Sequence, residues 1–160
     1  MISFLKSGFC YISLFSIFLI SCDSSRVFEE NREIENYKWS ADESVSFQVI
    51  IEEVDVPYNV YVNIRNAGHY RYSNFFLFIN THFPSGEIQR DTLECALATA
   101  DGKWLGDGLG DIWDNRILFK SDVRFPVTGE YQFELIQAMR DDPVEGIMDA
   151  GIRIEKKSTD

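Results

Sequence analysis

The sequence predicts an all-β chain, a single β-sandwich of jelly-roll or immunoglobulin-like type with roughly eight antiparallel strands. Apolar residues recur at every second position in several short segments, as in strands with one buried face. Gly, Pro, Asn and Asp separate these segments at spacings of about ten residues. The chain also holds 13 Phe, 7 Tyr and 3 Trp, and half-buried sheets favour aromatic side chains. No segment has a sustained helical stripe, and a closed β-barrel is the alternative.

The first predicted strands lie between residues 45 and 79. Alternating apolar residues predict strands over 45–51 and 60–64, and Asn66-Ala67-Gly68 predicts the turn after the second. The apolar run 75–79 is continuous, which predicts a strand buried on both sides. Pro84-Ser85-Gly86 then predicts another turn.

The second half of the chain follows the same pattern. Leu93, Cys95 and Leu97 share one face of the next predicted strand, which Asp101-Gly102 ends. Further strand segments are predicted at 117–119, 123–125, 131–136 and 152–155, with turns at 126–129 and 141–143. Because Cys95 alternates with apolar neighbours and has no adjacent His or basic residue, we expect a core position and not a reactive thiol.

The N-terminus predicts a lipoprotein signal peptide. Lys6 precedes an apolar run from Phe9 to Ile20, which is too short to span a bilayer. Leu19-Ile20-Ser21-Cys22 resembles a bacterial lipobox. We therefore expect cleavage between Ser21 and Cys22, with a lipid on Cys22. The predicted organisation is a signal peptide over 1–21, a lipidated tether over 22–44 and the sandwich over 45–160.

Charge and cysteine content narrow the function classes. Without residues 1–21 the chain keeps 14 basic and 26 acidic side chains, a net charge of −12. This balance argues against nucleic acid and against electrostatic docking on anionic lipid. Cys10 leaves with the signal peptide and Cys22 is acylated, so Cys95 has no partner for an intramolecular disulfide.

Catalytic patterns are not found in the sequence. His69 and His82 are the only histidines, and neither lies in a metal-binding spacing. No Gly-x-Ser-x-Gly elbow occurs, and the acidic pairs have no apolar neighbours to separate two pKa values. We therefore expect no catalytic residue, no metal, no cofactor and no enzymatic activity.

The segment 104–115 concentrates Gly, Asp and Trp, and it is the candidate partner-binding patch through Trp104, Asp107, Asp111 and Trp113. Calcium ligation by Asp107, Asp111 and Asp114 is one alternative, although the spacing is not that of an EF-hand. Sugar stacking on the two tryptophans is another. A glycine-rich connection with capping aspartates over packed tryptophans is the simplest interpretation.

Several segments together resemble the gliding-motility lipoprotein GldH family. They are Phe28-Glu29-Glu30-Asn31-Arg32, Tyr37-Lys38-Trp39, Tyr61-Val62-Asn63-Ile64-Arg65-Asn66, Tyr72-Ser73-Asn74, Asp101-Gly102-Lys103-Trp104-Leu105-Gly106, Gly108-Leu109-Gly110-Asp111-Ile112, Asp114-Asn115-Arg116-Ile117-Leu118, Arg124-Phe125-Pro126, Gln137-Ala138-Met139-Arg140 and Gly151-Ile152-Arg153-Ile154-Glu155-Lys156. The resemblance implies a lipoprotein of gliding Gram-negative bacteria, whose motility machinery overlaps with type IX secretion. It implies no enzymatic activity and no defined binding site.

Two functional hypotheses follow. The first is a non-catalytic, lipid-anchored scaffold or assembly component of the gliding machinery, with envelope proteins of that machinery or of type IX secretion as partners. The second is a glycan-binding lipoprotein on the cell surface, an idea that rests on fold analogy. In both, the lipid holds the protein on a membrane, which we expect to be the outer membrane.

Overall fold

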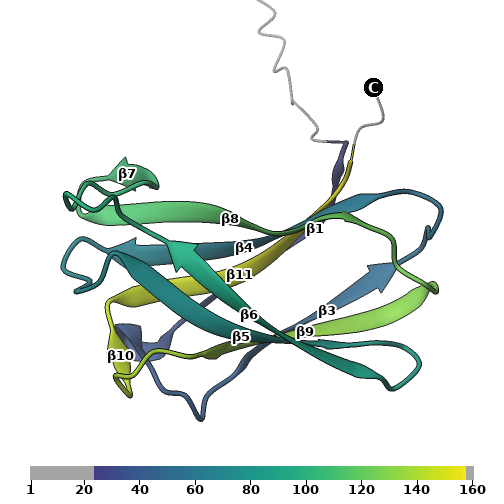
Figure 1. Ribbon diagram of the computed structural model, residues 1–160, viewed down its shortest axis with the longest axis horizontal. Coiled ribbons are helices and arrows are strands. Elements are labelled where there is room, and N and C mark those ends of the chain that lie inside the picture. Colours follow the sequence, from purple (N-terminus) through teal and green to yellow (C-terminus); the bar gives the residue numbers. More distant parts are fainter. Residues whose placement is uncertain (1–23, 158–160) are drawn as a thin grey trace, which may run out of the picture.

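Two antiparallel sheets stack face to face in the computed structural model, which describes residues 24–157 (Figure 1). The larger sheet has the strand order β1-β11-β4-β8-β7, and the smaller has the order β3-β9-β5-β6. The strands are β1 (Arg26–Glu33), β2 (Lys38–Trp39), β3 (Val45–Ile51), β4 (Tyr58–Ala67), β5 (Asn74–His82), β6 (Ile88–Ala96), β7 (Asp107–Leu109), β8 (Ile112–Val123), β9 (Gly129–Gln137), β10 (Val144–Glu145) and β11 (Ile147–Lys156). This architecture confirms the predicted all-β sandwich.

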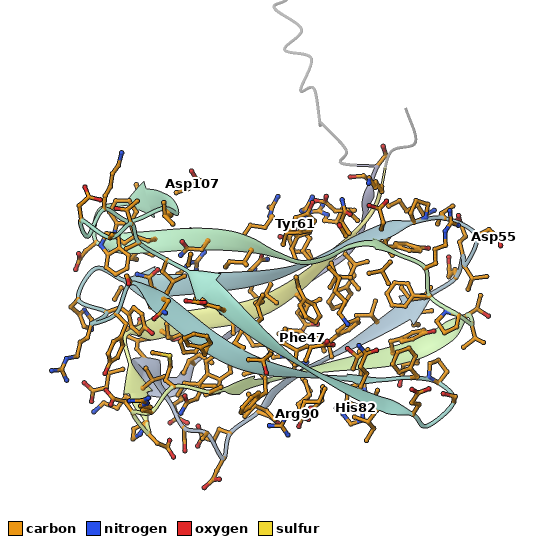
Figure 2. All side chains as sticks on the ribbon, in the orientation of Figure 1. Phe47, Asp55, Tyr61, His82, Arg90 and Asp107 are labelled. Carbon is orange, nitrogen blue, oxygen red and sulfur yellow. The ribbon has the colours of Figure 1, made fainter. Side chains whose placement is uncertain are left out.

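The core lies between the sheets and is built by alternation. In β4, Val60, Val62 and Ile64 are at most 1% exposed, while the residues between them are half-buried. Strands β3, β5 and β9 of the other sheet alternate in the same way. Phe47 accordingly points between the sheets, whereas Tyr61, Arg90 and His82 lie on outer faces (Figure 2). The predicted strands 45–51, 60–64, 131–136 and 152–155 are confirmed by this packing.

Cys95 occupies the core position that the sequence predicts. Its side chain is fully buried, and burial raises the pKa of the thiol to about 12. A thiol held in its protonated form is a poor nucleophile at neutral pH. The interpretation of Cys95 as a packing residue is therefore confirmed.

The expected tether over 22–44 differs from the structure. Residues Arg26–Glu33 form β1, which pairs with β11 along its length, and the short helix η1 (Glu35–Tyr37) and β2 follow. Ile34 and Trp39 belong to the core. The sandwich thus begins at Arg26 and not at Val45, because backbone pairing with β11 orders a strand whose own residues show no buried face.

Three further expectations are corrected. The run 75–79 lies in β5 with one buried face, because Phe76 and Phe78 are only half-buried on its outer side. The turn expected at Asn66-Ala67-Gly68 starts later, at Gly68, because Ala67 still pairs with Ile112. Segments 117–119 and 123–125 were expected as separate strand segments, but β8 is one strand from Ile112 to Val123. The predicted number of about eight strands agrees with the number of long strands only because this merger compensates for the unpredicted β1. The short strands β2, β7 and β10 come in addition.

Candidate functional site

Polar side chains form a connected face on the outer side of the larger sheet. The register places Asp149 beside Arg65, and Arg65 beside Asp114. In the next row, Asn63 lies between Gly151 and Arg116. Successive strand residues point to opposite faces, so these positions all lie opposite the core. The sheet thereby brings together side chains from β1, β4, β7, β8 and β11.

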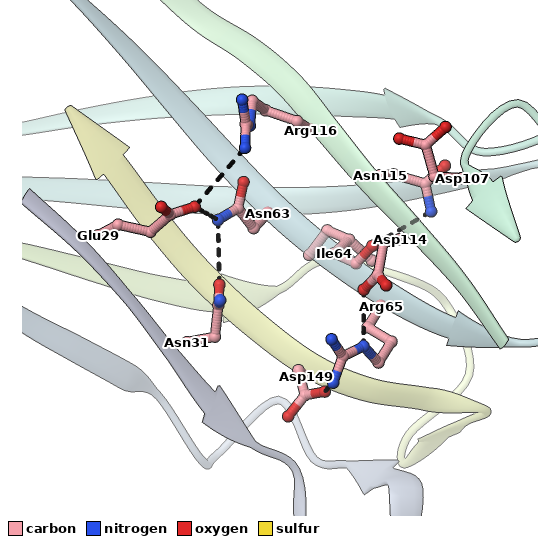
Figure 3. Close-up of a pocket in the computed structure, with 10 residues that line it drawn as sticks. All are labelled: Glu29, Asn31, Asn63, Ile64, Arg65, Asp107, Asp114, Asn115, Arg116 and Asp149. Carbon is pink, nitrogen blue, oxygen red and sulfur yellow. Dashed lines mark hydrogen bonds and ion pairs between the residues drawn. The ribbon is translucent and has the colours of Figure 1, made fainter. Parts of the chain in front are cut away.

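A hollow of about 350 Å³ opens in this face (Figure 3). We call it the polar hollow; its lining residues are Glu29, Asn31, Asn63, Ile64, Arg65, Asp107, Asp114, Asn115, Arg116 and Asp149. Gly151 lies beneath it in the sheet. An added Cβ at Gly151 would stand 1.9 Å from Oδ1 of Asn31 and 2.6 Å from the backbone oxygen of Glu30. Only glycine therefore lets β1 and the Asn31 side chain approach β11 so closely.

Arg65 is held by two carboxylates at one side of the polar hollow. Its Nε donates to Oδ1 of Asp114 at 2.6 Å, and its Nη1 donates to Oδ2 of Asp149 at 2.8 Å. The hydrogen bond that Arg65 donates to Asp114, with the charges of both carboxylates, outweighs desolvation and raises the pKa of Arg65. The guanidinium is thus fixed in orientation while its side chain stays 43% exposed.

Glu29 connects the other side of the hollow. It accepts hydrogen bonds from Nδ2 of Asn63 at 3.2 Å and from Nη1 of Arg153 at 2.6 Å. Arg153, whose side chain is only 6% exposed, also donates to Glu155. Burial raises the pKa of Glu29, but Arg153 and Arg26 together outweigh it, so this pKa lies below its ordinary value of 4.5. The face therefore contains a buried guanidinium that depends on Glu29 and Glu155 for charge compensation.

Arg116 and Asp107 are two exposed charged groups of the hollow. The side chain of Arg116 is 52% exposed and approaches Glu29 only to 3.8 Å. Asp107 lies directly opposite Asp114 in the β7–β8 pair, and like charges in such cross-strand pairs repel each other. These two side chains can therefore turn toward a bound partner at little expense to the sheet.

The residues that line the hollow interact mainly with one another. The charged groups form ion pairs and hydrogen bonds with one another, and no nucleophile lies beside a base among the lining residues. Within residues 24–157, no three His, Cys, Asp or Glu side chains are grouped so that they could hold a metal ion. The calcium alternative for segment 104–115 gains no support from this geometry.

The two histidines lie away from the polar hollow. His69 is exposed in the turn after β4. His82 lies at the end of β5, with its Nε2 3.7 Å from Glu134 and no hydrogen-bond partner for that atom among the described residues. Neither side chain is positioned to act on a group bound in the hollow.

The four residues of the expected patch have different surroundings in one hairpin. Segment 104–115 is a hairpin of β7 and the start of β8, and not only a loop. Trp104 and Trp113 are half-buried and stack on each other with ring centroids 6.4 Å apart. Asp107 lines the polar hollow, whereas the backbone oxygen of Asp111 accepts a hydrogen bond from Gly68 at the hairpin tip. The ring of Trp113 also lies against Gly108, so the two tryptophans are partly engaged with each other and with the hairpin.

The predicted lipidation site lies outside the described residues. Ser21 and Cys22 precede Ser24, the first residue that the structure describes. Cleavage and acylation at these positions therefore stay predictions. Between Ser24 and Lys157, no helix is long and apolar enough to cross a bilayer.

Sequence reasoning did not identify the residues that line the polar hollow, apart from Asp107 and Asp114. Asn63, Arg65 and Arg116 are the polar residues that alternate with core positions in β4 and β8. This alternation predicts an outer face but not its neighbours. Only the strand register brings Asp149 and Glu29, which are 120 residues apart in the sequence, to the same hollow.

Comparison with known proteins gives a consistent match along the chain. The profile of the family described as GldH lipoprotein matches residues 26–154. A protein named gliding motility lipoprotein GldH homolog, from Christiangramia forsetii, is 38% identical over 161 residues, covering 95% of this chain and 98% of the relative. The gliding motility lipoprotein GldH of Flavobacterium johnsoniae is 36% identical over 151 residues, covering 90% and 93%.

Solved structures resemble the chain only weakly. A structure of infectious bursal disease virus, Gt strain, aligns with a TM-score of 0.36 and 10% identity over 82% of this chain. A subviral particle of infectious bursal disease virus aligns with a TM-score of 0.34 and 9% identity over 84% of this chain. The chain spans 32% and 34% of the length of these two viral chains.

Proposed function

The chain belongs to the GldH lipoprotein family, and from this premise we propose that it is a lipid-anchored, non-catalytic scaffold or assembly component of the gliding motility machinery, linked to type IX secretion. Its partners would be envelope proteins of these systems. A lipid on Cys22 would hold it on the outer membrane. Family membership makes the chain a homologue of gliding motility lipoproteins, and the scaffold role is proposed in addition.

The polar hollow is the observation that carries the proposal. It presents Arg65, which two carboxylates hold in place, and the more open Arg116 on one sheet, next to the carboxylates of Asp107 and Asp114. Arginine is enriched in protein–protein interfaces, and fixed charges of both signs give a partner its orientation. A face of this kind supports specific recognition of a polar protein surface, and it contains no group arranged for catalysis.

Charge reversal at Arg116 tests this role. The Arg116→Glu variant should keep its fold, since within residues 24–157 Arg116 has no ion pair besides the long contact with Glu29. Arg140→Glu is the matched control, because Arg140 is exposed in the loop after β9, away from the hollow. In a gliding host that lacks its own copy of this protein, in-cell cross-linking with mass spectrometry should lose its partner adducts with Arg116→Glu but not with Arg140→Glu. Equal adducts and equal colony spreading for both variants would reject the polar hollow as the contact face.

The membrane anchor has its own test. Changing Cys22 to Ser should release the protein from the membrane fraction and stop colony spreading, because the acyl chains supply the binding free energy. An unmodified N-terminal cysteine in mass spectrometry of the native protein would contradict the proposal. Protease treatment of intact cells would then decide whether the domain faces the cell surface.

The glycan-binding alternative remains a testable hypothesis with less support. Trp104 and Trp113 are half-buried and stack on each other, which leaves less of their ring faces for a sugar. A glycan array probed with the domain discriminates between the two: specific sugar binding that Trp113→Ala removes would favour the alternative.

A further inference from the structure

The sandwich has two unlike ends. At one end, which we call the anchor end, the start of β1 meets the end of β11 and the start of β4, since Lys156 donates to the oxygen of Ser25 and Lys157 to that of Pro57. At the other, which we call the hairpin end, β7 and β8 meet the turn after β4. Figure 2 places Asp55 and Asp107 at these opposite ends.

The chain leaves the anchor end only a few residues from its predicted lipid. Asp23, Ser24 and Ser25 are the only residues between Cys22 and the first residue of β1. Four residue steps span at most about 14 Å. Between the row of Lys120 and that of Ile112, β8 extends by eight residues, or about 27 Å. A lipid on Cys22 therefore keeps the anchor end, and not the hairpin end, next to the bilayer.

Exposed apolar side chains gather at the anchor end. Val27 and Ile50 are 37% and 64% exposed, and both line a hollow of about 360 Å³ that also includes Ser24. Val127 in the loop before β9 and Ile88 at the start of β6 are 45% and 59% exposed at the same end. Apolar side chains beside the point where the chain emerges would face water unless lipid covers them.

Charges at this end are largely neutralised in pairs. Lys156 binds Glu53 at 2.7 Å, and Lys157 binds Asp122 at 2.7 Å. Two further cations at this end, Arg26 and Arg124, are engaged with Glu29 and with the backbone oxygen of Asp55, and the chain as a whole is acidic. Contact with a bilayer would therefore be made by apolar side chains and would not depend on lipid charge.

We propose that the anchor end lies against the lipid surface, with Val27 and Ile50 at the headgroup boundary and the hairpin end directed away from the membrane. This orientation rests on the proposed lipidation of Cys22. The hairpin end, with Leu105 and Leu109 at 55% and 84% exposed, then faces away from the bilayer, where partner proteins can reach it. The polar hollow lies on the outer face of the larger sheet between the two ends, with Asp107 of β7 and Glu29 of β1 both in its lining.

Depth-dependent fluorescence tests the orientation on the full lipidated protein in phosphatidylcholine vesicles. Ile50→Cys and Leu109→Cys variants are labelled with an environment-sensitive dye. Native Cys95 is fully buried with a raised pKa and stays unlabelled. Spin-labelled lipids should quench the dye at Ile50 several-fold more than the dye at Leu109. Equal quenching at both positions, or stronger quenching at Leu109, would overturn the orientation.

Two controls keep the outcomes distinct. Vesicle flotation precedes each measurement, so a protein that does not float contradicts the lipid anchor itself, whereas a floating protein with equal quenching contradicts only the orientation. Adding phosphatidylglycerol to the vesicles should leave the Ile50 quenching unchanged. Quenching that appears only with this anionic lipid would overturn the apolar contact in favour of an electrostatic one.

Discussion

The outer faces of the two sheets differ in how their polar groups are connected. On the larger sheet, Arg153, Glu29 and Asn63 form one network across three strands, and Arg65 joins two carboxylates beside it. On the smaller sheet the contacts are smaller groups: Glu134 accepts from Asn80 at 2.7 Å with Nε2 of His82 3.7 Å away, and Glu94 accepts from Asn74 at 2.8 Å. Half-buried Phe76 and Phe78 take up much of the remaining space there.

This difference separates a face whose charges are held in a connected network from a face whose polar contacts are smaller and more local. A buried guanidinium requires its carboxylates, so the network on the larger sheet fixes the positions of its charges. The pairs on the smaller sheet involve neutral amides, and each can be removed without leaving a buried charge. Substitutions of matched residues on the two faces should therefore have unequal effects.

Glu29→Ala should have the largest effect. It leaves the buried Arg153 with less charge compensation, and we expect a loss of about 3 kcal/mol in the free energy of unfolding. Glu134→Ala is the matched substitution on the smaller sheet, since the side chains of Glu29 and Glu134 are 20% and 23% exposed. It removes a hydrogen bond from Asn80 and should cost about 1 kcal/mol. Urea unfolding of residues 23–160 at pH 7 measures both, and equal losses would mean that the two faces do not differ as described.

Gly151→Ala should follow in size. The added methyl would meet Asn31 and the backbone oxygen of Glu30 at distances that require β1 to move, and overpacking of this kind costs about 2 kcal/mol. Adding Asn31→Ala should recover only part of the loss, because the backbone contact remains. Full recovery in the double variant would show that the Asn31 side chain alone, and not the approach of β1, requires glycine.

Acid should weaken both faces, and the larger sheet more. Glu29 and Glu134 both have pKa values below the ordinary 4.5. Each contributes stability that is present above that value and is lost as the pH falls through the lower pKa of the folded state. At pH values below 4.5, the urea concentration at the unfolding midpoint should therefore decrease. This decrease should be smaller in Glu29→Ala than in Glu134→Ala. The opposite order would place the main acid-sensitive group on the smaller sheet.

The sequence could predict the sandwich but not the connected face. Strands β3 and β9 have every second residue buried, and this period appears directly in the amino-acid order. Strand β1 has no fully buried residue, and its pairing with the backbone of β11 holds it in place. Its amino-acid order therefore shows no alternating pattern that would predict a strand. If β1 is not predicted, the position of Glu29 is unknown, and Glu29 cannot be recognised as a partner of Arg153. The candidate site therefore depends on register, which a single sequence specifies only through packing.

Substitution of Arg90 should have a smaller effect than the changes at Glu29 and Gly151 and than acid. Its guanidinium lies over the ring of Phe78 at 4.3 Å from the centroid, on the outer face of the smaller sheet. An exposed cation–π contact of this kind contributes about 0.5 kcal/mol, so Arg90→Ala should lower the free energy of unfolding by that amount and Arg90→Lys by less. Partner cross-linking should be unchanged, whereas Arg116→Glu on the other face should reduce it. Lost adducts in a stable Arg90→Ala protein would move recognition to the smaller sheet and reverse the assignment of the two faces.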